Sequence, residues 1–299
     1  MKKKIIACLA LSLLFTGCNA SSNSDIPTSL ESESEQEQLQ SEQISTEPQT
    51  ESIPRNLYYI TSNRTQDITN LHHFIDKITA DGYEWHEITI SELPADADAV
   101  IYNSPTEDMT SEEYAILDNY MNTGGHMLVL LPASESDTRY KYLGRLLEQF
   151  YIRLDYDLIT DTTNTEENNY IQVQAINYPD RFIFTDNSME NGIVYLRNSR
   201  SFHHLPQEEN THYDSMLQSL DSAIGIPYGG VEDDPETYEN EVLPVMIYCR
   251  EEERNNACFI VMGSSDFLLD ENYEDELAKP AQNWVYSSID WLYNYSRIH

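Results

Sequence analysis

The stretch from Asp98 to Pro132 constrains the fold more than any other part of the chain, because it predicts a strand, a helix and a second strand in succession. Ala99–Tyr102 and Met127–Leu131 are short and continuously apolar. Strands without polar alternation are typical of a parallel sheet that is covered on both faces. The stretch therefore predicts a βαβ unit within such a sheet.

The helix of this unit, Thr110–Thr123, carries signals at both ends. Thr110 is a candidate N-cap, and Glu113 stands three residues later, where it completes a capping box. Gly124 occupies the position at which a left-handed residue commonly ends a helix. One face of the helix carries the apolar side chains of Tyr114, Leu117 and Met121, which we expect to be buried.

Strand and helix patterns alternate on both sides of this unit, which predicts an α/β domain with a mostly parallel, doubly wound sheet. Strands are expected at Asn56–Thr61 and Trp85–Ile90. Helices are expected at Thr65–Asp81, at Thr138–Phe150 and from about Pro280, since proline is favoured at the first helical position.

Beyond Tyr151 the pattern becomes richer in β-structure. Short strands are expected at Asp157–Asp161, Tyr170–Ala175, Arg181–Thr185 and Gly192–Leu196, and a short helix is expected within Asn210–Ile224. The segment 242–263 predicts a two-stranded hairpin with a polar turn. We therefore expect one α/β domain over residues 55–299, with a β-richer insertion at about 165–240.

Residues 1–18 predict an export signal. Lys2–Lys4 form a basic region, and Ile5–Phe15 is apolar but too short to cross a bilayer as a mature helix. Phe15-Thr16-Gly17 before Cys18 resembles the lipobox of bacterial lipoproteins, in which the cysteine is lipidated and becomes the mature N-terminus. The resemblance implies a lipid anchor on the extracytoplasmic face of the bacterial cell membrane. An ordinary cleaved signal and an uncleaved anchor are the alternatives.

Residues 19–54 predict a tether between this anchor and the folded domain. The segment has no aromatic residue and is rich in Ser, Glu and Gln, a composition that cannot bury enough surface to fold. As a coil it would span about 30 Å. The formal net charge of the chain is −35, and −38 without Lys2–Lys4. Such a charge repels nucleic acid and anionic headgroups, so neither is expected as a partner.

Cys249 and Cys258 lie on the two strands of the expected hairpin. If Arg250 pairs with Ala257, the two cysteines face each other directly. Directly opposed residues approach closely enough for a disulfide bond, and an exported compartment permits oxidation. The sequence thus predicts a cross-strand disulfide, with two buried free thiols as the alternative.

Asp266 is the polar residue with the most interesting position. It follows the apolar strand Cys258–Met262, and open α/β sheets bind ligands at the carboxyl ends of their strands. We group it with Ser104, Ser264 and Ser265 as a tentative ligand-binding or partner-binding loop. An Asx turn or a helix cap would explain the same residues.

Other residues give weaker indications of chemistry. The expected strand Met127–Leu131 is followed by neither a cysteine nor a nucleophile elbow, and a serine such as Ser134 is more typical of a turn or cap. His72-His73 and His203-His204 are adjacent pairs whose side chains diverge, so structural roles are expected. The acidic run at 232–236 lacks the ligand spacing of a calcium loop. We assign no catalytic residue, no metal site and no cofactor.

Several segments resemble the GldG family of ABC-transporter accessory proteins, known from gliding motility. They are SEEYAILDNYMNTGGHMLVLLP at 111–132, LGRLLEQFYIRLDYDLITD at 143–161, VMGSSDFLLDEN at 261–272 and Ile289-Asp290-Trp291-Leu292. The chain departs from the family at 150–152, where Tyr-Gly-Ile is frequent, and at Ser264, where an acid is usual. The resemblance implies a sheet like that of class I glutamine amidotransferases, a flavodoxin-like fold, related to the IFT52-type domain of intraflagellar transport.

The preferred hypothesis is a non-catalytic, lipid-anchored accessory subunit that contacts the permease or ATPase of an ABC-type transport system. One alternative is a solute-binding lipoprotein that takes a small ligand at the carboxyl end of the sheet, in a polar pocket near Ser104 and Asp266. A second is a diverged hydrolase that uses Ser134, which would need a histidine and an acid within reach.

Overall fold

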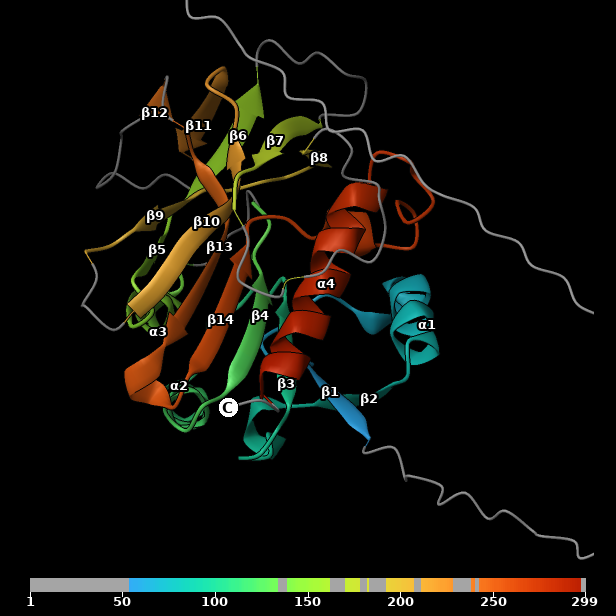
Figure 1. Cartoon of the computed structure of the whole chain (residues 1–299), viewed down its shortest axis with the longest axis vertical. Coiled ribbons are helices and arrows are strands. Elements are labelled where there is room, and N and C mark those ends of the chain that lie inside the picture. The colour runs from blue at the N-terminus through green and yellow to red at the C-terminus, as the bar shows by residue number, and fades with distance from the viewer. Residues whose placement is uncertain are drawn as a thin grey trace, which may run out of the picture. The chain divides into compact units, whose positions relative to one another are not determined.

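Five parallel strands form one half of a nine-stranded central sheet in this computed structural model (Figure 1). In spatial order they are β2 (Tyr83–Ile88), β1 (Arg55–Ile60), β3 (Ala99–Asn103), β4 (His126–Leu130) and β14 (Ala257–Met262). The structure describes residues 54–133, 139–161, 170–177, 182, 192–206, 211–227, 238–239 and 242–296. Among these five strands the order is 2-1-3-4-5, that of a doubly wound sheet.

The other half of the sheet is antiparallel. It continues from β14 through β13 (Pro244–Glu251), β10 (Thr211–Ser219), β7 (Ile171–Ala175) and β8 (Ile193–Leu196). Two smaller sheets pack beside it, one of β6 (Asp157–Asp161), β11 (Ala223–Pro227) and β12 (Tyr238–Glu239), the other of β5 (Ile152–Leu154) and β9 (Phe202–His204). The expected α/β class is therefore confirmed as a mixed fold, and strands of the β-richer region extend the central sheet itself.

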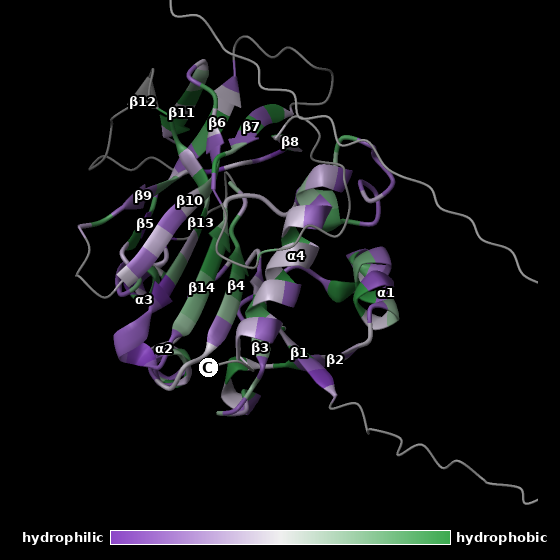
Figure 2. Ribbon diagram, in the orientation of Figure 1, coloured by the Kyte–Doolittle hydropathy of each residue, from purple (hydrophilic) through white to green (hydrophobic). Residues whose placement is uncertain are grey.

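Helices cover both faces of the sheet. The buried side chains of α1 (His72–Ala80) and α4 (Lys279–Ser296) share one hydrophobic cluster with Ala99 and Ile101 of β3. Those of α2 (Ser111–Asn122) and α3 (Lys141–Glu148) share the other with Val100 and Tyr102, the alternate residues of the same strand. Figure 2 shows the resulting apolar strands β4 and β14 between the helices. This double cover explains why the strands lack polar alternation.

The βαβ unit formed by β3, α2 and β4 is confirmed. The Thr110 hydroxyl accepts a hydrogen bond from the Glu113 amide at 3.2 Å, and the Glu113 carboxylate accepts one from the Thr110 amide at 2.8 Å. Gly124 follows the helix with a φ of 97°, the left-handed conformation expected of a terminating residue. Tyr114, Leu117 and Met121 are buried.

Other element predictions need correction. The short helix expected within Asn210–Ile224 is wrong, because this segment forms the long strand β10. The helix expected from Thr65 begins instead at His72, after a single 3-10 turn at Ile68–Asn70 that Asp67 caps. The helix expected at Thr138–Phe150 is shorter, since α3 covers only Lys141–Glu148. Most of the strand expected at 181–185 lies outside the described residues.

The predicted disulfide is also wrong. Cys249 pairs with Phe259, and Cys258 pairs with Arg250, one position away from the expected register. Because successive residues on a strand point to opposite faces, a one-residue shift separates the two sulfurs. Both cysteines are buried free thiols, and they belong to different hydrophobic clusters on opposite faces of the sheet.

The predicted export signal, Cys18 and nearly all of the tether lie outside the described residues. Within the described ranges, no helix combines the length and apolar character that a membrane span requires. The lipid anchor therefore remains a prediction from the sequence.

Candidate functional site

The carboxyl ends of β3 and β14 bring two of the predicted residues together. Ser104 directly follows β3, and its hydroxyl lies 2.7 Å from the hydroxyl of Ser265, which follows β14. The Ser104 hydroxyl donates to Asn103 Oδ1 at 2.8 Å, so the proton between the two serines comes from Ser265. The two strand ends are thus joined by a short chain of hydrogen bonds.

Asp266 lies beside this pair but has a different partner. Its carboxylate accepts a hydrogen bond from the side-chain amide of Asn198, a residue that sequence reasoning did not identify. Burial raises the pKa of the Asp266 carboxyl, while the Asn198 hydrogen bond and the nearby Arg197 charge act in the opposite direction. The backbone oxygen of Asp266 accepts from Asn272 at 2.9 Å, which holds the turn in place.

Ser264 has a structural role within the predicted loop. Its side chain is fully buried, and its hydroxyl donates to the backbone oxygen of Arg197 at 2.7 Å. The preceding Gly263 accepts from the Arg200 amide at 3.0 Å. Ser264 therefore fastens the segment 197–200 to the end of β14, rather than facing the same space as Ser104.

Residues with left-handed backbone conformation gather at this edge of the sheet. Asn63 and Arg64 after β1 have φ values of 62° and 49°, Ser104 after β3 has 50°, and Asn198 has 46°. Such conformations are uncommon for residues other than glycine, especially for Arg, and they concentrate at functional sites. Asn63 accepts from the Tyr102 hydroxyl at 2.8 Å and donates to Glu113 at 3.1 Å. The loops after β1 and β3 are consequently bonded to each other and to α2.

The helix N-termini at the same edge are occupied by side chains of the chain itself. Asp108 accepts from the amides of Tyr142 and Leu143 in the first turn of α3, at 2.8 and 3.1 Å. Asp270 does the same for α1 by accepting from the His73 amide at 3.0 Å. Helix N-termini at the carboxyl ends of strands are the usual phosphate sites of doubly wound folds. Here carboxylates already fill those positions.

Asp270 illustrates the electrostatic consequence. Desolvation acts to raise the pKa of its carboxyl, but the hydrogen bonds from His73 and His72 outweigh it, so the pKa is lowered. His72 Nδ1 lies 2.9 Å from this carboxylate, and the His73 ring stacks on Tyr273. Both histidines thus have structural partners, and the lowered pKa of Asp270 favours a negative charge at the helix end.

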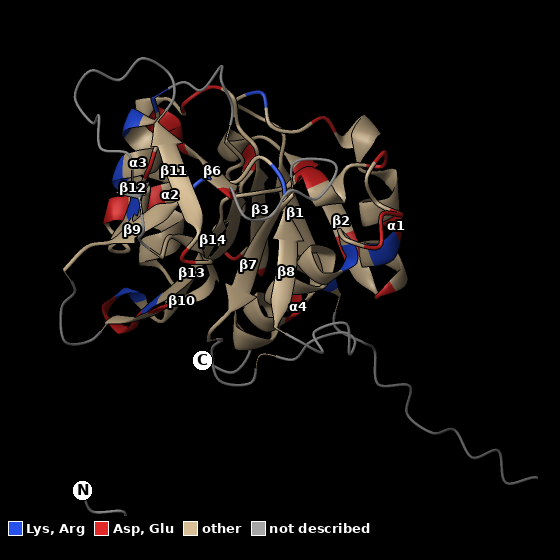
Figure 3. Ribbon diagram, turned by 90° about the horizontal axis from the view of Figure 1, so that it is seen from above, with Lys and Arg blue, Asp and Glu red and all other residues tan. Residues whose placement is uncertain are grey.

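Acidic residues lie on the loops and helix ends around the sheet, with basic residues between them (Figure 3). Among the described residues, no three His, Cys, Asp or Glu side chains are arranged to hold a metal ion. Ser134 and the acidic run at 232–236 lie outside the described residues. The residues on which the hydrolase alternative and a calcium loop would depend thus lie outside the described part of the chain.

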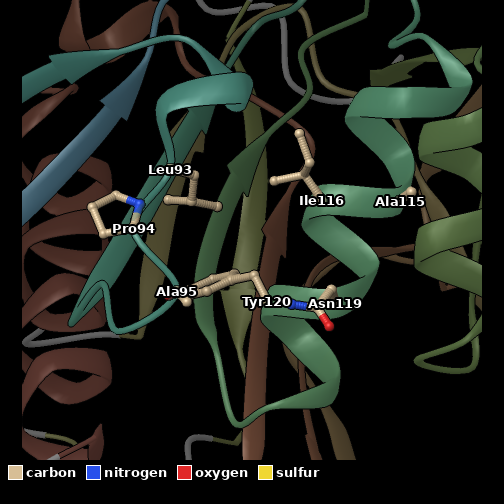
Figure 4. Close-up of a pocket in the computed structure, with 7 residues that line it drawn as sticks. All are labelled: Leu93, Pro94, Ala95, Ala115, Ile116, Asn119 and Tyr120. Atoms are coloured by element: carbon tan, nitrogen blue, oxygen red, sulfur yellow. The ribbon is translucent and has the colours of Figure 1, made fainter.

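A pocket of about 300 Å³ lies away from Asp266, between α2 and the connection from β2 to β3. It is lined by Leu93, Pro94, Ala95, Ala115, Ile116, Asn119 and Tyr120 (Figure 4). The Tyr120 hydroxyl lies 3.0 Å from the backbone oxygen of His126 and 3.2 Å from that of Ala97, and it accepts from the His126 amide at 2.9 Å, so the polar end of this ring is already used. The pocket is largely apolar and differs from the polar pocket that the solute-binding hypothesis expects near Ser104.

A second polar group that the sequence did not reveal is buried beside β6 and β9. It consists of Asp155, Asp157, Ser201 and His203, which come from two segments far apart in the sequence, 155–157 and 201–203. His203 and the neighbouring His204 diverge, as expected of an adjacent pair, since His204 contacts Ser215 at 2.7 Å. No local motif links these residues, and only the fold brings them together.

No family model matches the chain, and no curated protein is similar to it. Among solved structures, the mmIFT52 N-terminal domain is similar with a TM-score of 0.58 and 13% identity, covering 79% of this chain and 96% of that one. A cytoplasmic protein from Salmonella typhimurium (TM-score 0.39, 10% identity, coverage 79% and 98%) is less similar. So is an exo-β-1,4-mannosidase from Opitutaceae bacterium strain TAV5 (0.38, 9%, coverage 82% and 36%). The similarity to the mmIFT52 domain shows the α/β fold alone. The similarities to the other two structures are too weak to support any inference.

Proposed function

We propose that this protein is a non-catalytic, lipid-anchored extracytoplasmic accessory subunit of an ABC-type transport system. Its carboxyl-end loops contact a permease or ATPase-associated component. The proposal rests on the GldG-like segments, on the lipobox-like residues before Cys18, and on the geometry of the sheet edge where the parallel strands have their carboxyl ends. The same reasoning favours a fold like that of class I glutamine amidotransferases, because the five parallel strands have the order 2-1-3-4-5.

The observation that carries the proposal is the occupation of this edge by the chain's own side chains. Asp108 and Asp270 take the helix N-termini, and Ser104 and Ser265 are bonded to each other. A phosphate or carboxylate ligand would have to displace these groups and would meet negative charge. Fixed loops with satisfied polar groups suit contact with another protein surface better than capture of an anion.

The test uses the full-length chain in membranes of its native host. Chemical cross-linking followed by affinity purification should recover a permease or ATPase component, and Cys18→Ser should release the protein from the membrane fraction. Asp266→Ala should weaken the cross-link, whereas Asp221→Ala, on an exposed turn, should not. Recovery of the anchored protein without any transport component would refute the accessory role.

A second candidate function is capture of a small neutral or basic solute at the same edge. The observation in its favour is Asp266, whose carboxyl is largely withdrawn from water at the end of β14 and has a raised pKa. A thermal-shift screen with amines, amino acids and sugars would test it. A ligand-induced rise in Tm that disappears in Asp266→Asn supports solute capture, and the absence of any such rise refutes it for these classes.

A further inference from the structure

The four-residue polar cluster of Asp155, Asp157, Ser201 and His203 has no part in the proposed function, yet all of its members except the half-buried His203 are deeply buried. Asp157 is 1% exposed, Asp155 is 4% exposed and Ser201 is fully buried. Burying two carboxyl groups side by side is costly unless each is paired or neutral. The stability of the cluster therefore depends on which of its groups carry protons.

The cluster lies at a junction between segments. The Asp155 amide donates to the backbone oxygen of Ser201 at 3.2 Å, and the Ile159 amide donates to the backbone oxygen of Ser199 at 2.8 Å. On its other side the segment 199–201 contacts the end of β14, where the Arg200 amide donates to Gly263. The segment thus joins β6 and its three-stranded sheet to the central sheet.

The contacts of the Ser201 hydroxyl with the two carboxyl groups require one more proton than this hydroxyl carries. The Ser201 hydroxyl lies 2.8 Å from Asp157 Oδ2 and 3.2 Å from Asp155 Oδ2, but it has only one hydrogen to donate. If both carboxyl groups were ionised, one of these contacts would join two oxygens with no hydrogen between them. A proton on one carboxyl oxygen, donated to the Ser201 oxygen, resolves the conflict.

The surroundings of each carboxyl identify the protonated one. Asp155 has a hydrogen-bond donor and a cation beside it, since His203 Nδ1 contacts its Oδ2 and the Arg153 guanidinium lies 3.5 Å from its Oδ1. Asp157 accepts the Ser201 amide at 2.9 Å through Oδ1, but its Oδ2 faces Gly225, where any Cβ would overlap it. That Cβ would also lie 3.2 Å from the Leu243 side chain. The ionised form is therefore better supported at Asp155.

We propose that Asp157 is held as a neutral carboxylic acid and that this proton fastens the junction between β6 and the segment 199–201. In this arrangement Asp157 Oδ2–H donates to the hydroxyl oxygen of Ser201. The Ser201 hydroxyl in turn donates to Asp155 Oδ2. His203 Nδ1–H donates to the same Asp155 oxygen. Every polar hydrogen in this arrangement then has an acceptor, and losing the Asp157 proton leaves two facing carboxylates.

The charges around the cluster agree with this assignment. Burial is the largest influence and raises the pKa of Asp157 to about 6, with Asp155 adding to the rise. The Ser201 hydrogen bonds and the Arg200 charge oppose it. The hydrogen bond to Asp155 raises the pKa of His203, against desolvation and the Arg153 charge.

The sign of the pH dependence follows. The folded-state pKa of Asp157 lies above its unfolded value of 3.8, so the stabilising effect of its proton is complete below that value and is lost as the pH rises through about 6. A shift of about two pKa units corresponds to an increase in the unfolding equilibrium constant on the order of 100-fold between pH 4 and pH 8. His203 contributes a slope of the same sign.

Two isosteric variants distinguish this proposal from simple packing. Asp157→Asn replaces the carboxyl O–H with an amide N–H that can donate to Ser201. We expect it to be more stable than the wild type at pH 8, by up to about 100-fold in the unfolding constant, and to show a smaller pH slope. Asp155→Asn removes the negative charge and one of the two acceptor oxygens that face Ser201, His203 and Arg153, and it should destabilise at every pH. Asp221→Asn, on an exposed turn, is the control and should change neither quantity.

The measurements are chemical denaturation between pH 4.5 and 8.5 and, in the wild type, a carboxyl-carbon NMR titration with labelled aspartate. The wild-type spectrum should contain one carboxyl that titrates near pH 6 and is missing in Asp157→Asn. Hydrogen exchange at residues 155–159 and 199–201 should accelerate beyond its intrinsic pH dependence above pH 6. Equal destabilisation by the two variants, an unchanged slope in Asp157→Asn, or no carboxyl titrating above pH 5 would overturn the proposal.

Discussion

Gly263 is a position where the structure leaves no room for a side chain. A Cβ built there would overlap the backbone oxygen of Arg200 and lie 3.1 Å from its carbonyl carbon. The obstacle is backbone, and it is fixed on its other side because the Arg200 guanidinium donates to the Pro132 oxygen at 2.7 and 3.2 Å. Gly263→Ala must therefore push the segment 199–201 away from the end of β14.

The expected cost can be worked out from these contacts. Overpacking a tightly packed site costs about 1–3 kcal/mol. The displacement also weakens the hydrogen bond from the Arg200 amide to Gly263, which contributes about 1 kcal/mol. We expect a loss of about 2–4 kcal/mol in the free energy of unfolding, or a Tm lower by about 5–15 °C for a domain of this size.

Differential scanning calorimetry and urea denaturation measure this loss, and Gly144→Ala is the matched control. Gly144 lies in α3, and a Cβ there would meet nothing within 4 Å. The same substitution should raise stability by about 0.5–1 kcal/mol, because alanine favours the helix. A Gly263→Ala protein within 0.5 kcal/mol of the wild type would refute the close-approach argument.

Three further predictions follow from single contacts. Thr110→Ala removes the cap of α2 and should cost about 1 kcal/mol in urea denaturation, and an unchanged midpoint would contradict the capping box. Asp108→Ala uncaps α3 and leaves two amides without their acceptor, so we expect a loss of about 1–2 kcal/mol by the same assay, with a smaller loss in Asp108→Asn. Cys249 and Cys258 should react with a maleimide only after unfolding, and a reductant should leave Tm unchanged, whereas an intact mass that shows a disulfide would contradict the observed register.

Local patterns predicted the βαβ unit well because each of its signals acts within a few residues. The Thr110–Glu113 capping box and the left-handed Gly124 are formed by neighbours in sequence. The register of the hairpin was not predictable in this way. Its loop, 252–256, ends in Asn255 and Asn256, both left-handed, and it is one residue shorter than the six-residue turn that a pairing of Arg250 with Ala257 would leave.

The strand β10 was mistaken for a helix for a related reason. Its pairing with β13 shifts twice, between Ser215 and Leu217 and again before Gln218, so the alternation of buried and exposed residues breaks. Three consecutive buried residues, 215–217, result. A bulge removes the period of two on which strand prediction depends.

The candidate site was predictable only where it follows from topology. Ser104 and Ser265 come after parallel strands, and parallel strands end at the same edge, so their contact could be anticipated. Asn198 follows β8 at the far end of the antiparallel half, and no sequence signal connects it with Asp266. Long-range pairings of this kind depend on strand order, which the sequence pattern leaves open.

The acidic composition has more than one physical role. Fifty-two Asp and Glu residues first suggested a solvated, repulsive surface. Particular acids instead occupy positions that doubly wound folds usually offer to ligands, since Asp108 and Asp270 close helix N-termini. A third acid, Asp157, is too deeply buried to contribute surface charge. An edge whose anion sites are closed by covalently attached carboxylates gains rigidity and loses affinity for phosphates. That loss is the physical reason for expecting a protein, rather than a nucleotide, at this edge.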